Sequence, residues 1–77
     1  MSVEADEVLD ASGLSCPLPV LKAQKRLATM ASGCVLQLIS TDPAAVRDVT
    51  ELCAARGHVL VKDQAEAGRY AFWIKRA

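Results

Sequence analysis

Apolar residues along the 77-residue chain follow two spacings, one typical of strands and the other of helices. Four short, largely apolar stretches predict strands, at 8–11, 35–39, 59–62 and 70–75. Two stretches in which apolar residues recur every three or four positions predict helices, from 17 to about 31 and from 42 to 57. The order βαβαββ predicts an α/β (α+β) two-layer sandwich, in which two helices cover one face of a four-stranded mixed sheet.

Each predicted helix has an apolar stripe that we expect to pack on the sheet. The stripes consist of Val20, Ala23, Leu27 and Met30 in the first helix and of Val46, Val49 and Cys53 in the second. Asp42 and Pro43 predict the start of the second helix, because an Asp at the N-cap accepts an orphan N–H and a proline has none to offer. The first crossover predicts that strands 8–11 and 35–39 run parallel, and residues 64–68 are expected to form a hairpin loop.

Alternation along the last strand separates its aromatic residues. If Tyr70, Phe72 and Ile74 face the helices, Trp73 points to the open side of the sheet, together with Leu60 or its neighbours. An exposed Trp on that side would mark a contact surface, whereas a partly covered ring would carry no function. The sequence leaves both interpretations open.

Charge and hydropathy exclude several classes of protein. Nine Lys and Arg balance nine Asp and Glu, so the formal net charge is zero, which argues against stable direct binding of nucleic acid. The longest uncharged stretch, 30–41, is too short and too polar to cross a membrane, and the acidic first ten residues are unlike a secretory signal. We therefore expect a cytoplasmic protein with no membrane contact, formed by one domain over 1–77 with a flexible N-terminal tail at 1–6.

The three cysteines are widely spaced, which is typical of a reducing compartment rather than of a disulfide framework. Cys53 belongs to the apolar stripe of the second helix, so we expect it in the core. Cys34 opens the second strand and is either a bystander, which we favour, or a resolving thiol. Together with His58, the cysteines lack the paired close spacing of structural zinc sites, so no metal is expected.

Cys16 stands at the head of the first predicted helix. Pro17 and Pro19 are tolerated only in a first turn, where the N–H groups lack helical partners, and this places Cys16 at the N-cap. The first-turn amides and the helix dipole are then expected to lower the pKa of the thiol below its ordinary value of about 8.5, with help from Lys22. Because the thiolate is the nucleophile, Cys16 is the candidate catalytic residue.

The chain lacks the usual companions of a hydrolytic or redox cysteine. Its only histidine, His58, is not placed near Cys16 by any sequence rule, and no second cysteine stands two residues away. A lone activated cysteine suits transfer of sulfur between thiols as a persulfide. The alternatives are that Cys16 is a small buried residue that caps a helix, and that the protein is a non-catalytic adapter that binds protein or RNA.

Residues 9–19, Leu-Asp-Ala-Ser-Gly-Leu-Ser-Cys-Pro-Leu-Pro, resemble the signature of the TusA/SirA-like sulfur carriers. Residues 41–44, Thr-Asp-Pro-Ala, followed by Arg47 and Asp48, resemble the second motif of that family. The resemblance covers nearly the whole chain. It implies a βαβαββ sandwich and a transient persulfide on Cys16, with no further cofactor, on a carrier rather than an independent enzyme.

The resemblance also implies partners. A cysteine desulfurase or another donor protein supplies the sulfur, and a downstream acceptor protein takes it, in one branch toward 2-thiouridine in tRNA and in others toward molybdenum cofactor or the use of reduced sulfur compounds. Leu18, Thr41 and Cys34 depart from the tRNA-thiolation branch or from many members, which leaves the pathway open.

Two further groups of residues are expected around the sulfur. The residues expected to shape the site are Gly13, Pro17, Leu18, Pro19, Asp42 and Arg47. Lys22, Lys25 and Arg26 share the predicted exposed side of the first helix, within about two turns of Cys16. These cations either solvate a helix face or dock an acidic partner.

Overall fold

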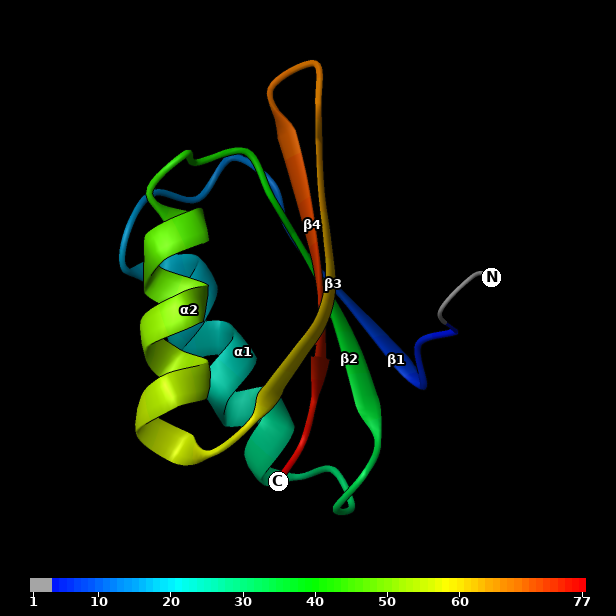
Figure 1. The fold of residues 1–77 in the computed structure, drawn as a ribbon. Coiled ribbons are helices and arrows are strands. Elements are labelled where there is room, and N and C mark those ends of the chain that lie inside the picture. Colours follow the sequence, from blue (N-terminus) through cyan, green and yellow to red (C-terminus); the bar gives the residue numbers. More distant parts are fainter. Residues whose placement is uncertain (1–3) are drawn as a thin grey trace.

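The structure, a computed structural model, describes residues 4–77 and has the predicted order of elements. They are β1 (Glu7–Ala11), α1 (Leu18–Ala28), β2 (Val35–Ser40), α2 (Ala45–Arg56), β3 (Val59–Glu66) and β4 (Arg69–Lys75). Both helices lie on one face of a single four-stranded sheet (Figure 1). The predicted two-layer α+β sandwich is confirmed.

The sheet is mixed, with the strands in the order β1-β2-β4-β3. β1 pairs with β2 in parallel, as predicted, and the β2–β4 and β4–β3 pairs are antiparallel. The loops that follow β1 and β2 therefore leave the sheet at the same edge, because the carboxyl ends of adjacent parallel strands coincide there. This arrangement brings together two segments that are far apart in sequence.

The core lies between the helices and the inner face of the sheet. Ala23 and Leu27 of α1 and Val49 of α2 are buried against inward residues of the central strands, among them Leu38 and Phe72. Met30, just beyond α1, is buried with them, although the helix ends three residues before the predicted limit at about 31.

The apolar stripe of α2 differs from the prediction in one position. Val46 is 42% exposed, whereas Ala45, Val49, Leu52 and Cys53 are buried. Leu52 and Cys53 lie three and four positions after Val49, which lies four positions after Ala45, so the four residues share one helix face; Val46 lies at the margin of that face, about 100° around the axis from Ala45. Placing Val46 in the core was therefore wrong, because the helix turns it toward solvent.

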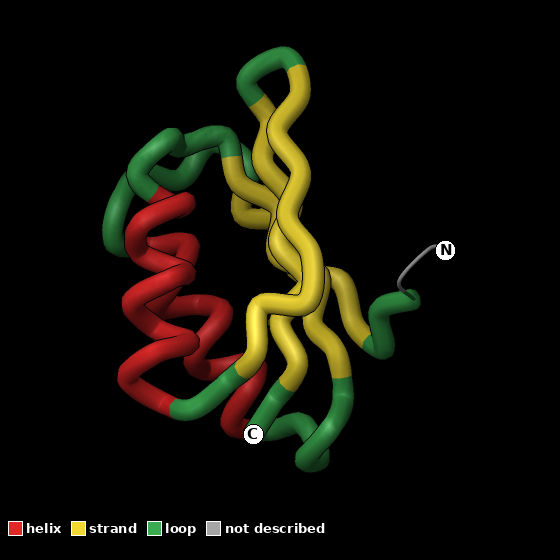
Figure 2. The backbone as a smooth tube through the Cα atoms, in the orientation of Figure 1, coloured by secondary structure: helices red, strands yellow, loops and turns green. Residues whose placement is uncertain are grey.

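The β3–β4 hairpin is longer than predicted. Pairing continues to Glu66 and Arg69, so the connection is a two-residue turn at Ala67 and Gly68 rather than a loop over 64–68. Both turn residues have positive φ, 51° and 77°, which suits the tight turns that join twisted antiparallel strands. Figure 2 shows this hairpin extending beyond the ends of the helices. The sequence did not predict this extension of β3, because the end of the strand is exposed on both faces and its side chains are mostly polar.

Trp73 faces away from the helices, but it is covered. Its side chain is only 7% exposed, and the Lys62 ammonium lies 5.0 Å from the centre of its ring. Leu60, expected beside Trp73, instead packs with the core on the helix side, because the register of β3 shifts between Leu60 and Lys62. An exposed contact surface centred on Trp73 is therefore not present.

The chain is tied to the sheet just before β1. The Asp6 N–H donates to the Val35 carbonyl, and the Val35 N–H donates to the Asp6 carboxylate, both at 2.8 Å. Asp6, the last residue of the predicted flexible tail at 1–6, thus pairs with the start of β2, and 1–3 lie outside the described residues. Within 4–77, no helix is long and apolar enough to cross a membrane.

Candidate functional site

Cys16 lies in the loop between β1 and α1, beside the loop between β2 and α2 (Figure 1). Two hydrogen bonds join these loops: the Gly13 N–H donates to the Thr41 hydroxyl at 2.9 Å, and the Cys16 N–H donates to Oδ2 of Asp42. Gly13 has a φ of 81°, a conformation that favours glycine, and this turns the chain back from β1 toward the second loop. The site is thus built from both predicted motifs.

Asp42 connects the two loops through both of its carboxylate oxygens. Oδ1 accepts the Ala44 N–H at 2.9 Å, and Oδ2 accepts the Cys16 N–H. The hydrogen bond from Ala44, and then that from Cys16, hold the pKa of Asp42 below its usual value. Asp42 therefore joins the two loops, and because α2 begins at Ala45, it caps the turn before the helix and not, as was predicted, the helix itself.

Cys16 is not the N-cap of α1. The helix begins at Leu18, and Pro17 occupies the cap position after a cis peptide bond from Cys16. The Leu18 N–H donates to the Ser15 carbonyl at 2.9 Å, and Pro19, in the first turn, has no N–H. The predicted N-cap position of Cys16 is therefore wrong, because Pro17 occupies it, and the Leu18 N–H that was expected to face the sulfur is engaged by the Ser15 carbonyl.

The partner of the Cys16 sulfur is a carboxylate. Sγ donates a hydrogen bond to Oδ2 of Asp48, in the first turn of α2, at 2.8 Å. This hydrogen bond, followed by desolvation and the negative charges of Asp48 and Asp42, raises the pKa of the Cys16 thiol; Arg47 acts in the opposite sense. The predicted lowering of the pKa of Cys16 is therefore wrong, and Lys22 is not among the groups that shift it.

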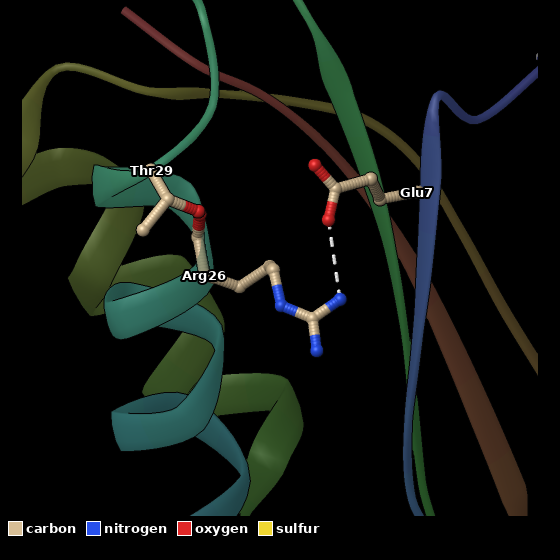
Figure 3. Close-up of polar contacts among 3 residues, drawn as sticks. All are labelled: Glu7, Arg26 and Thr29. Carbon is tan, nitrogen blue, oxygen red and sulfur yellow. Dashed lines mark hydrogen bonds and ion pairs between the residues drawn. The ribbon is translucent and has the colours of Figure 1, made fainter.

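The exposed side of α1 next to Cys16 combines apolar and basic residues. Leu18 and Leu21 are 45% and 48% exposed, and Lys22 and Lys25 are exposed as well. Arg26 does not join them, because it turns toward β1 and forms an ion pair with Glu7 at 3.1 Å (Figure 3). The predicted basic trio is thus reduced to Lys22 and Lys25.

The other cysteines and the histidine lie apart from this site. Cys53 is buried, as predicted, and burial raises the pKa of its thiol; Cys34 is partly buried, and the structure shows all three cysteines free. His58 follows the far end of α2, where its Nδ1 accepts the Ala77 N–H at 3.0 Å. Among residues 4–77, no three His, Cys, Asp or Glu side chains gather where they could hold a metal ion.

Two shallow hollows flank the Cys16 loop. One is lined by both loops, from Gly13 to Ser15 and from Thr41 to Pro43. The other lies between the helices, where Pro17 and Val20 face Asp48 and Glu51. Because both hollows open to solvent, the sulfur is accessible to a protein surface rather than enclosed as in a small-molecule pocket.

Comparisons with known proteins agree with these motifs. The family profile described as "Sulfurtransferase TusA" matches residues 7–76. The chain is 42% identical over 76 residues to the sulfur carrier protein TusA of Pseudomonas aeruginosa, covering 99% of this chain and 96% of that protein. It is 46% identical over 72 residues to the sulfur carrier protein TusA of Allochromatium vinosum, covering 94% and 95%.

The fold is also found in a solved structure. The crystal structure of the SirA-like protein from Desulfitobacterium hafniense superposes with a TM-score of 0.79 at 22% identity, covering 90% of this chain and 95% of that one. The profile match and the curated relatives span almost the full length of the chain, including both loops that build the site. The chain therefore belongs to the TusA sulfurtransferase family.

Proposed function

We propose that this protein accepts sulfane sulfur as a persulfide on Cys16 from a donor protein and passes it to an acceptor protein. The observation that carries the proposal is the exposed thiol of Cys16, held by two loops at one edge of the sheet in a chain of the TusA family. Cys34 is partly buried and Cys53 is buried, so they are less accessible to a partner.

The setting of Cys16 suits exchange between proteins. The sulfur lies between open hollows, and the adjacent face of α1 offers exposed Leu18 and Leu21 beside Lys22 and Lys25. An apolar patch with a basic rim fits a partner surface that is apolar at its centre and acidic around it. A cysteine desulfurase or another protein with a cysteine persulfide would be the donor.

Mass spectrometry after incubation with a donor tests the proposal. A cysteine desulfurase with cysteine, or thiosulfate with a thiosulfate sulfurtransferase, should add one sulfur to the protein, and the addition should map to the peptide that contains Cys16. A thiol reductant should remove it. Sulfur mapped mainly to Cys34 or Cys53 would contradict the proposal, and absence of loading would favour an adapter without sulfur chemistry.

A destination in tRNA 2-thiouridine synthesis needs its own test. A bacterial strain that lacks its TusA should regain 2-thiouridine in tRNA when this chain is expressed. A protein that loads on Cys16 but does not restore 2-thiouridine would serve another sulfur pathway, in keeping with Leu18 and Thr41, which differ from the residues of the tRNA branch.

A further inference from the structure

The reacting sulfur already has a charged neighbour before any partner arrives. Cys16 Sγ donates to Oδ2 of Asp48 at 2.8 Å, across 32 positions of sequence. The Asp48 N–H donates to the Ala44 carbonyl at 3.1 Å, so the backbone of Asp48 belongs to the first turn of α2, from which its side chain reaches Cys16. A hydrogen bond from a thiol to a carboxylate exists only while the sulfur carries its proton.

We propose that Asp48 favours the release of sulfur from Cys16, because its carboxylate stabilises the unloaded thiol and repels the persulfide anion of the loaded state. The inference rests on the proposed function and deepens it. It concerns how strongly Cys16 holds its sulfur, not whether sulfur binds there.

The exchange balances without an oxidant or a reductant. The Cys16 thiol gives up its proton, and the resulting thiolate attacks the terminal sulfur of the donor persulfide. A bond forms between Sγ and that sulfur while the S–S bond of the donor breaks, and the donor thiolate takes up the proton. In sum, a thiol and a persulfide anion become a persulfide anion and a thiol.

Loading reverses the effect of Asp48. A persulfide is a stronger acid than a thiol, so loaded Cys16 is an anion at neutral pH and has no proton to donate. The hydrogen bond that stabilised the empty state is lost, and two negative groups face each other at close range. Both changes favour the empty carrier, so they add rather than compensate.

The other charged groups around Cys16 do not cancel this effect. Asp42 adds negative charge, and its two oxygens are engaged by the Ala44 and Cys16 N–H groups. Arg47 is the opposing cation, but its side chain is exposed, where solvent and salt weaken its influence. α1 brings no acidic residue in its first turn.

An exchange equilibrium tests the inference directly. Wild type, Asp48→Asn and Glu51→Gln are each equilibrated at neutral pH with a fixed mixture of glutathione persulfide and glutathione, and the persulfidated fraction at Cys16 is measured by mass spectrometry. Asp48→Asn should raise the equilibrium constant for loading roughly three- to tenfold, since tenfold corresponds to about one pKa unit of differential interaction. Glu51→Gln, with the same charge change in the same hollow, should match wild type.

Alkylation reports on the empty state without sulfur transfer. Because Asp48 raises the pKa of the Cys16 thiol, Asp48→Asn should react faster with iodoacetamide at neutral pH, and its rate profile should shift to lower pH. Asp48→Ser removes the same charge with a smaller side chain, and it should behave alike if the Asn variant folds poorly.

The outcomes separate the two proposals. Normal loading with equal equilibrium constants in wild type and both Asp48 variants would overturn the role of Asp48 alone. A wild-type protein that does not load at all would overturn the proposed function, and this inference with it.

Discussion

The two helix starts face each other at one edge of the sheet, yet they differ in what they carry. The start of α1 holds the exposed Cys16 thiol, two prolines and an exposed Leu18, without a charged side chain from Gly13 to Leu21. The start of α2 holds three charged groups that shift the pKa of that thiol: Asp42, Arg47 and Asp48. One segment thus carries the thiol and the other sets its electrostatics.

This difference between the two helix starts shows that neither motif forms the candidate site by itself. Asp42 makes the connection, since its carboxylate accepts one N–H from each loop. The Cys-Pro-Leu-Pro segment taken alone suggests a helix N-terminus that lowers the pKa of the thiol, whereas the hydrogen bond to Asp48 in the first turn of α2 raises it. Changes in the first segment should therefore abolish function, and changes in the second should adjust it.

The largest effect is expected from Cys16→Ser. Serine is close in size and cannot form a persulfide, so loading should fall to background while the thermal unfolding midpoint stays near that of wild type, because Cys16 is exposed. Loading is measured by mass spectrometry and folding by circular dichroism. Cys34→Ser is the matched control and should load normally. An unfolded Cys16→Ser protein would show instead that this cysteine is there for structure.

The second prediction breaks the connection between the loops. Asp42→Asn should lower the free energy of unfolding at neutral pH and speed hydrogen exchange at the Cys16 amide, because Asn replaces a charged acceptor of two backbone N–H groups. The folded-state pKa of Asp42 is depressed, so its stabilisation is present above the unfolded value of about 3.9 and is lost as the pH falls through the folded value.

Urea unfolding at a series of pH values checks this. The difference between wild type and Asp42→Asn should be largest near neutral pH and shrink below about pH 4. Asp10→Asn is the matched control: hydrogen bonds with Ser12 lower the pKa of Asp10 too, but they join the end of β1 only to the turn that follows it. It should show the same pH trend without faster exchange at Cys16. Equal exchange in both variants would contradict the connecting role of Asp42.

The fold was predictable because the spacing of apolar residues along each element indicates which of its faces is buried. That spacing can be recognised without knowing where distant segments lie. The stripe of Ala23 and Leu27 in α1 was read correctly for that reason. Errors arose where backbone pairing or helix phase decided the outcome. The tip of the hairpin is paired although its side chains are exposed, and Val46 lies one position off the buried face of α2.

Of the candidate site, the sequence pointed to the cysteine and to the acid that joins the two loops. Cys16 and Asp42 stand in short motifs whose proline and capping chemistry is local. The contact between Cys16 and Asp48 depends on how two loops and the first turn of α2 are placed on the sheet edge, which no local rule contains. The only sequence feature that pointed to Asp48 was its place in the Arg47-Asp48 pair after the second motif. Arg26 was misplaced similarly, since its long side chain reaches Glu7 on another element.

The third prediction concerns the basic rim beside the sulfur. Lys22→Glu with Lys25→Glu should slow loading from a cysteine desulfurase several-fold at low salt, because exposed charges mainly affect association rates. Alkylation by iodoacetamide, which needs no docking, should be nearly unchanged. The matched control reverses two exposed cations of β4, Arg69→Glu with Lys75→Glu. Equal loading rates in both double variants would leave Lys22 and Lys25 as solvated surface.

The smallest effect is expected from Arg47→Gln, and it tests whether the second loop adjusts the sulfur in both directions. Arg47 opposes the acids, so its removal should raise the pKa of the Cys16 thiol further and slow alkylation at neutral pH. Because the side chain is exposed, the change should be about twofold or less and should vanish at high salt. Arg56→Gln, at the far end of the same helix, should leave the rate unchanged. A faster rate in Arg47→Gln would mean that charge does not control this thiol, and the electrostatic distinction between the two helix starts would fail.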